Sequence, residues 1–237
     1  LIGRLLYETG ALKTDQIEHI EERSNAKGFD YLDLSLATDG LLTEREQGIT
    51  IDVSHIFFST PKRRFIIADS PGHVEYTRNM VTGSSTAQAS IILLDARKGV
   101  IEQTKRHFFI TQLLGIKQII FAVNKMDLVD YSQDIFDDIK KTLKHLVEKH
   151  GQKGVSYHYT PVSALFNENV VSASEKLDWY DGVPLLRLIE SLPVEKNQAN
   201  DGAFQIQYVI RPKREELHDY RGFAGNVRSG SFAVGDP

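Results

Sequence analysis

Two apolar runs constrain the fold of this chain more than any other feature. Residues 89–95 and 117–123 are rich in Ile, Leu, Val, Phe and Ala and contain few polar interruptions. Strands of this kind are buried on both faces, as in parallel sheets that helices cover. Helical patterns follow at 102–114 and 132–150. This order predicts an α/β domain with a doubly wound, mostly parallel sheet, whose ligands bind at the carboxyl ends of the strands.

Further elements are expected before the first apolar run. Residues 50–58 and 64–69 have strand patterns and are joined by a turn-rich connector, so they are predicted to pair as a hairpin at one edge of the sheet. An amphipathic helix is expected at 1–7, and a short helix between the capping Thr14 and Gly28. Residues 43–46 fit a capping box.

The turn from Asp69 to His73 joins the end of a strand to a segment with helical character. An aspartate in this place can hold its carboxylate beside a phosphate-bound Mg²⁺, and Gly72 leaves its backbone N–H free to approach an anion. His73 stands where a side chain can position a water against the terminal phosphate. Such turns occur in many α/β folds and a lone histidine is often only a surface residue, so the other motifs must support this interpretation.

Thr50 lies upstream of the turn, where the pattern changes from helical to alternating. Its hydroxyl and carbonyl can reach Mg²⁺ and the terminal phosphate, and they would order the loop only when that phosphate is present. The alternative is that Thr50 is a β-forming residue on an exposed strand face. Asp69 at the end of the next strand favours the metal role, so both residues are predicted to contribute to a magnesium site.

The motif Asn124-Lys125-Met126-Asp127 follows the second apolar run and carries the most specific chemistry. Asp127 can accept two hydrogen bonds from guanine. Adenine would instead place a hydrogen-bond acceptor against the carboxylate and leave its charge unpaired. Asn124 can bridge base and protein, and Lys125 can lay its methylene stem over the ring. Ser163 can steady Asp127, and the Ala164 N–H can donate to guanine O6. The alternative is an ordinary polar loop between a strand and a helix.

A glycine-rich phosphate loop of the pattern G-x-x-x-x-G-K-[ST] does not occur in the 237 residues. In nucleotide-binding α/β proteins this loop lies between the first strand and a helix such as the one expected at 1–7. The expectation is that the sequence begins just after the loop, and the alternative is a protein that never had one.

Composition indicates the cellular compartment and the kinds of partner that are expected. The sequence has no cysteine, which excludes disulfides and thiolate metal sites and fits the cytoplasm. No apolar run approaches the roughly 20 residues that cross a bilayer, and no signal peptide precedes the first helix, so no membrane association is expected. A net charge of −4 argues against nucleic-acid binding driven by charge alone.

The four motifs together resemble the translation-factor class of P-loop GTPases. They are the segment around Thr50, the turn Asp69 to His73, the motif Asn124 to Asp127 and the stretch Ser163-Ala164-Leu165. Within this class the chain is most similar to the large GTPase subunits of bacterial sulfate adenylyltransferase. The narrower resemblance rests on the stretches at 1–7, 95–100, 169–171, 179–180, 207–209, 211–212 and 221–225.

The resemblance implies an activity and a partner. Such subunits hydrolyse GTP to drive formation of adenylyl sulfate from ATP and sulfate, while a separate small subunit in a heterodimer or larger assembly binds ATP and sulfate. Thr50 would be the switch threonine, Asp69 the Mg²⁺-linked aspartate and His73 the water-positioning residue. The guanine contacts would come from Asn124, Lys125, Asp127, Ser163, Ala164 and Leu165. The alternative function is a translation-type GTPase that delivers aminoacyl-tRNA.

The same resemblance predicts the domain organisation. Residues 1–194 would form the GTPase domain, 195–202 a polar linker, and 203–237 the first strands of a β-barrel domain. Strands are expected at 204–210, 221–227 and 231–234. Three strands cannot close a barrel, so the natural chain is expected to continue.

Overall fold

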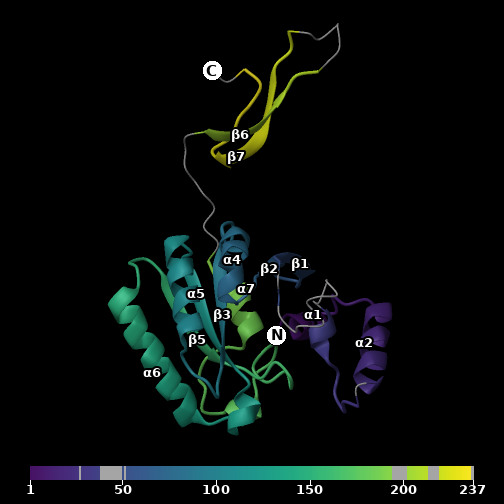
Figure 1. Cartoon of the computed structure of the whole chain (residues 1–237), viewed down its shortest axis with the longest axis vertical. Coiled ribbons are helices and arrows are strands. Elements are labelled where there is room, and N and C mark those ends of the chain that lie inside the picture. Colours follow the sequence, from purple (N-terminus) through teal and green to yellow (C-terminus); the bar gives the residue numbers. More distant parts are fainter. Residues whose placement is uncertain (27, 38–49, 51, 194–201, 213–218, 236–237) are drawn as a thin grey trace. The chain divides into compact units, whose positions relative to one another are not determined.

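The computed structural model describes residues 1–26, 28–37, 50, 52–193, 202–212 and 219–235. The chain divides into two compact units, Leu1–Leu192 and Pro193–Pro237. Figure 1 shows helices around strands in the first unit and a β-hairpin in the second. The capping box expected at 43–46 and the expected linker, except Gly202, lie outside the described residues.

Three strands of the first unit form a parallel sheet in the order β3-β4-β5. They are β3 (Ala89–Asp95), β4 (Gln118–Asn124) and β5 (Ser156–Pro161), and Gln118 pairs with both Ala89 and Ser156 at the start of the ladders. Every residue of β4 is buried, because the strand is central and covered on both faces. The prediction of parallel strands is confirmed, and burial on both faces holds for β4. It is wrong for β3, where Ile91 is 38% and Leu93 is 47% exposed, because β3 is an edge strand of the described sheet and its other face packs in a core.

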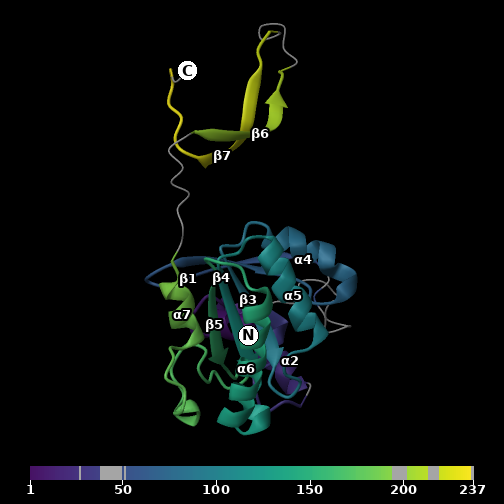
Figure 2. The same ribbon diagram turned by 90° about the vertical axis from the view of Figure 1, so that its left-hand side faces the viewer.

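Helices cover both faces of this sheet, as Figures 1 and 2 show together. One face packs against α5 (Glu102–Leu113) and α6 (Gln133–His150), and the other against α1 (Ile2–Glu8) and α7 (Leu185–Ser191). The odd-numbered apolar side chains of β4 enter the first core and the even-numbered ones the second, because successive side chains of a strand point to opposite faces. The doubly wound arrangement is confirmed.

The expected hairpin forms, but it begins later than predicted. Strands β1 (Ser54–Ser59) and β2 (Arg64–Asp69) are antiparallel, with Ser54 opposite Asp69. Upstream, the Val53 N–H donates to the side chain of Asp52 at 2.7 Å. A local bond of this kind competes with strand pairing, so Thr50 lies in irregular chain rather than in the strand.

The position of the hairpin also differs from the prediction of an edge on the main sheet. Among the described residues, β1 and β2 make a sheet of their own. Phe58 of β1 is 6% exposed and packs in the core that α1 and α7 share with β4. Side-chain packing, rather than a continuous ladder, therefore attaches the hairpin.

The remaining elements of the first unit are helical. The N-terminal region contains α2 (Thr14–Ala26) and the short 3-10 helix η1 (Leu34–Ala37). The turn after β2 leads through η2 (Val74–Tyr76) into α4 (Thr77–Ser84). A last 3-10 turn, η4 (Glu175–Leu177), precedes α7. No helix in the described ranges is both long and apolar enough to span a membrane.

The second unit contains β6 (Ala203–Ile210) and β7 (Gly222–Ser229), which are antiparallel. The strand expected at 231–234 is wrong, because 231–233 are irregular and a turn follows. Gly230 adopts φ 67°, which ends the extended chain, and the Phe232 ring lies edge-on to Phe204 instead of entering a ladder. A completed barrel remains a prediction.

Candidate functional site: a guanine-nucleotide site at the ends of the strands

The motif expected to bind the base leaves the central strand through an unusual backbone conformation. Asn124 is the last residue of β4, and Lys125 adopts φ 66°, in the left-handed region. This conformation is costly for an L-residue, so it persists only where the surrounding structure holds it. It reverses the chain, so the 3-10 turn η3 (Met126–Val129) follows at once with Asp127 in it. A backbone hydrogen bond of 3.3 Å joins η3 to the chain just beyond β5.

Two further hydrogen bonds, each involving a side chain, join this motif to the loop after β5. Ser163 Oγ donates to Asp127 Oδ1 at 2.6 Å, and the Ala164 N–H donates to Asn124 Oδ1 at 3.0 Å. The contact expected between Ser163 and Asp127 is therefore confirmed. The Ala164 N–H, which the sequence assigned to guanine O6, here ties Asn124 to the loop. Among the described residues, Asp127 Oδ2 makes no hydrogen bond, so it can accept one from a ligand.

Arg4 of α1 holds the same loop through hydrogen bonds to its backbone carbonyls. Its Nε donates to the Ala164 carbonyl at 3.0 Å, Nη2 donates to the Leu165 carbonyl, and Nη1 pairs with Glu8 at 3.1 Å. The side chain of Arg4 is only 14% exposed. A planar guanidinium can hold two neighbouring carbonyls at once, so Arg4 fixes the backbone that presents the Ala164 N–H.

Lys125 is held on its other side by Asp95, the last residue of β3. Lys125 Nζ lies 2.9 Å from Asp95 Oδ2, and Arg97 donates to both carboxylate oxygens, at 2.6 and 3.0 Å. The hydrogen bonds from Arg97, followed by those from Lys125, hold the pKa of the Asp95 carboxyl far below its usual range. Asp95 is therefore ionised at neutral pH and sets the direction of the Lys125 side chain.

The residues expected near the phosphates lie around the end of β2. Asp69 ends that strand and His73 is exposed. The Gly72 carbonyl accepts from two side chains of α5, Gln103 at 2.8 Å and His107 at 3.2 Å. Thr50 is half-buried in irregular chain beside residues outside the described part, so its place at a magnesium ion stays a prediction.

Sequence reasoning did not assign site roles to Arg4, Asp95, Gln103 and His107. Asp95 pairs with Asn124 in the ladder register, so its place at the end of an apolar run was a usable signal. Arg4 lies 160 residues from its carbonyl partner along the chain, and no periodicity connects such distant positions.

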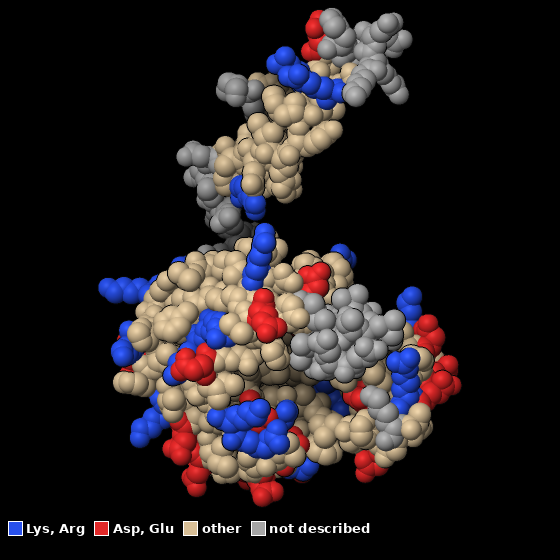
Figure 3. Space-filling model, in the orientation of Figure 1, with Lys and Arg blue, Asp and Glu red and all other residues tan. Residues whose placement is uncertain are grey.

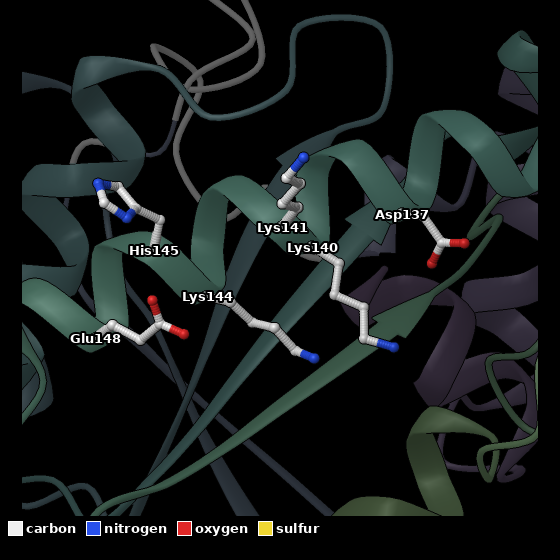
Figure 4. A pocket seen from close by; sticks show the side chains of 6 residues that line it. All are labelled: Asp137, Lys140, Lys141, Lys144, His145 and Glu148. Atoms are coloured by element: carbon white, nitrogen blue, oxygen red, sulfur yellow. The ribbon is translucent and has the colours of Figure 1, made fainter.

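A surface hollow of about 480 Å³ lies elsewhere, along α6. Figure 4 shows that its six labelled side chains all come from this one helix and include none of the motif residues. Its lining mixes lysines with two acidic side chains. On the face of the first unit in Figure 3 both signs of charge are likewise interspersed. The motif residues, rather than this hollow, mark the candidate site.

Comparison with known proteins places this geometry in a family. Residues 1–193 match the family described as the elongation factor Tu GTP binding domain. The whole chain is 51% identical to the sulfate adenylyltransferase subunit 1 of Aeromonas hydrophila subsp. hydrophila and 49% identical to the bifunctional enzyme CysN/CysC of Mycobacterium tuberculosis. It covers 49% of the former and 38% of the latter, so the chain spans half or less of these curated relatives.

Solved structures agree on the fold. The Ski7 GTPase-like domain of S. cerevisiae, bound to GDP and inorganic phosphate, has a TM-score of 0.69 and 17% identity, over 90% of this chain and 52% of that one. The bacterial selenocysteine-specific elongation factor has a TM-score of 0.55 and 23% identity, over 81% of this chain and 30% of that one. The chain belongs to the family of elongation factor Tu GTP-binding domains, within the translation-factor class of GTPases.

Proposed function

We propose that this chain is part of the GTP-hydrolysing subunit of a sulfate adenylyltransferase. GTP hydrolysis by this subunit would drive the formation of adenylyl sulfate and pyrophosphate from ATP and sulfate. The observation that carries the proposal is identity of about one half, over the entire chain, to proteins named sulfate adenylyltransferase subunit 1. The cysteine-free sequence fits a cytoplasmic reaction.

The base site supports the guanine specificity in this proposal. Asp127 is held by Ser163 through one carboxylate oxygen, and the other can accept from guanine N1–H or from the exocyclic amine. Lys125 can lay its stem on the ring while Asp95 holds its ammonium group. Ala164 and Leu165 form the loop beside the base, and Arg4 holds their carbonyls.

The hydrolytic roles rest on the turn after β2. Asp69 and Thr50 offer the carboxylate and hydroxyl oxygens that Mg²⁺ prefers, so their donors fit this ion. Bound Mg²⁺ would neutralise charge on the β- and γ-phosphates. Gly72 would turn its N–H to the γ-phosphate, and the exposed His73 would position the attacking water.

The partner in this proposal is a small subunit that binds ATP and sulfate. The relatives are named subunit 1, which implies at least one other subunit in those enzymes. A heterodimer is the simplest assembly that follows for this protein.

The test is pyrophosphate release from ATP and sulfate by the intact protein mixed with its small subunit, with and without GTP. Strong stimulation by GTP is expected, and His73→Ala should abolish most of it while GTP still binds. His145→Ala is the matched control, because His145 is an exposed histidine of α6 outside the motifs. Intact GTP binding without any sulfate-dependent product would instead favour the tRNA-delivering alternative.

A further inference from the structure

The Gly72 carbonyl is held by a pair of side chains one helical turn apart. Gln103 Nε2 and His107 Nε2 lie 2.8 and 3.2 Å from this oxygen. Positions i and i+4 share one face of a helix, and a carbonyl oxygen has two lone pairs to accept both donors. Burial lowers the pKa of His107, so the neutral ring with its proton on Nε2 can donate here.

The helix that carries these donors is fixed in the core. Phe108, next to His107, is fully buried among the apolar side chains of β3 and β4. Thr104 is 4% exposed, and its hydroxyl accepts a hydrogen bond of 3.4 Å from the Ile101 N–H at the start of the helix. Donors on such an element keep their positions, so they can define where the Gly72 carbonyl points.

The turn also packs directly on the two side chains. A Cβ atom at Gly72 would lie 2.5 Å from Gln103 Nε2 and 3.4 Å from a ring carbon of His107. On the side of α4, the buried Ser70 Oγ has no hydrogen-bond partner in the described part of the chain. The side-chain hydrogen bonds at the Gly72 carbonyl therefore come from α5.

The direction of this carbonyl has a consequence for hydrolysis. In a trans peptide the C=O and the following N–H point in opposite directions. Holding the Gly72 oxygen toward α5 aims the His73 N–H away from α5 and fixes the backbone from which the His73 side chain extends. A rotation of this peptide would break both bonds to α5.

We propose that Gln103 and His107 are positioning residues for GTP hydrolysis, which hold the Gly72–His73 peptide in the orientation that places His73 beside the attacking water. The proposal rests on the proposed GTPase function. It assigns to α5 control over the hydrolytic turn through contacts separate from the proposed base site, whose residues follow the carboxyl ends of β4 and β5.

The experiment compares single-turnover GTP hydrolysis with GDP affinity in the intact protein. Gln103→Met and His107→Phe remove the donors at similar side-chain size, and the double variant should hydrolyse GTP about tenfold to a hundredfold more slowly, as misplaced groups do. Its dissociation constant for fluorescent GDP should stay within about twofold of wild type, because the base site is intact. The single variant His107→Gln keeps a donor, the amide, at this position. It should therefore hydrolyse GTP at most of the wild-type rate.

Lys105→Met is the control on the same helix, since its ammonium group pairs with Glu102 and its side chain is 43% exposed. An unchanged hydrolysis rate in the double variant would overturn the proposal. A loss of GDP affinity in step with hydrolysis would also overturn it, because the side chains would then support the fold alone. Absence of GTP binding in the wild type would instead refute the proposed function itself.

Discussion

At the scale of single residues, the proposed site predicts that one carboxylate oxygen of Asp127 decides which base is accepted. In Asp127→Asn the Ser163 hydroxyl can still donate to the remaining oxygen, but an NH₂ group replaces Oδ2. This group opposes the donors of guanine and suits the C2 carbonyl of xanthine. GTP affinity should therefore fall about a hundredfold or more, and that of the xanthine nucleotide should rise.

Competition between fluorescent GDP and the guanine or xanthine nucleotides measures both effects. Asp130→Asn is a matched control, because Asp130 is exposed three residues later and its φ of 51° suits asparagine equally well. Equal GTP affinity in Asp127→Asn and in the control would contradict the assignment of the base site.

Arg4 offers a second test at this scale, because it never touches the base in the proposed mode. Arg4→Lys keeps the charge but cannot span the Ala164 and Leu165 carbonyls. Loss of hydrogen bonds to a charged group costs about 1.5–3 kcal/mol, so nucleotide affinity should fall roughly tenfold as the loop loosens.

Glu8→Gln supplies the control for Arg4. It removes only the ion pair at 3.1 Å, which contributes little on a helix surface. Isothermal titration with GDP would measure both variants. An Arg4→Lys protein that binds GDP as tightly as Glu8→Gln would show that the loop holds its shape without Arg4.

At the scale of elements, the sequence predicted those whose signal is local. The buried strand β4 was predictable because apolar side chains on both faces need two covering layers. The same pattern in β3 misled, because Ile91 and Leu93 remain exposed at the edge of the sheet. The start of β1 was missed because one side chain, Asp52, competes with the ladder. The strand predicted at 231–234 does not form, because Gly230 ends the extended chain.

In the candidate site, too, some contacts were predictable from local sequence and others were not. Ser163 and Asp127 were matched from their motifs, whereas Arg4 and Gln103 act on carbonyls brought close only by the fold. A backbone carbonyl has the same chemistry in every residue, so no letter in the sequence marks it as a partner. Such positioning contacts need the structure.

The connection from β5 to α7 depends on Asn169, which is 2% exposed and adopts φ 57°. Its Nδ2 donates to the Pro161 carbonyl at 2.7 Å and to Thr160 Oγ1 at 3.3 Å. Asn169→Gly keeps the backbone angle but loses both bonds, at a cost of about 1–3 kcal/mol of unfolding free energy. Asn169→Ala should lose roughly 1–2 kcal/mol more, because alanine resists the left-handed conformation.

Urea unfolding would give both free energies. Asn167→Gly is the control in the same loop, since Asn167 has φ 60° and its buried Oδ1 has no hydrogen-bond partner among the described residues. Equal stability of the Gly and Ala variants at 169 would show that backbone strain does not contribute there.

At the scale of the whole molecule, α5 and the parallel sheet each contain a histidine whose protonation opposes folding. Burial lowers the pKa of both His107 and His158 below the ordinary value of 6.5. The unfolded chain therefore takes up protons at a higher pH than the folded one. Their contribution to stability is complete above about pH 6.5 and is lost as pH falls through their lowered pKa values.

The midpoint of thermal unfolding should accordingly decline between about pH 7 and pH 5, before most carboxylates titrate. In a variant with both His107→Gln and His158→Gln the decline should be shallower, because neither amide titrates, and Gln at 107 keeps a donor for the Gly72 carbonyl. His145→Gln on the exposed face of α6 should leave the slope unchanged. Scanning calorimetry at matched ionic strength measures the three slopes. An equally steep decline in the double variant would mean that groups other than these two histidines cause the loss of stability in acid.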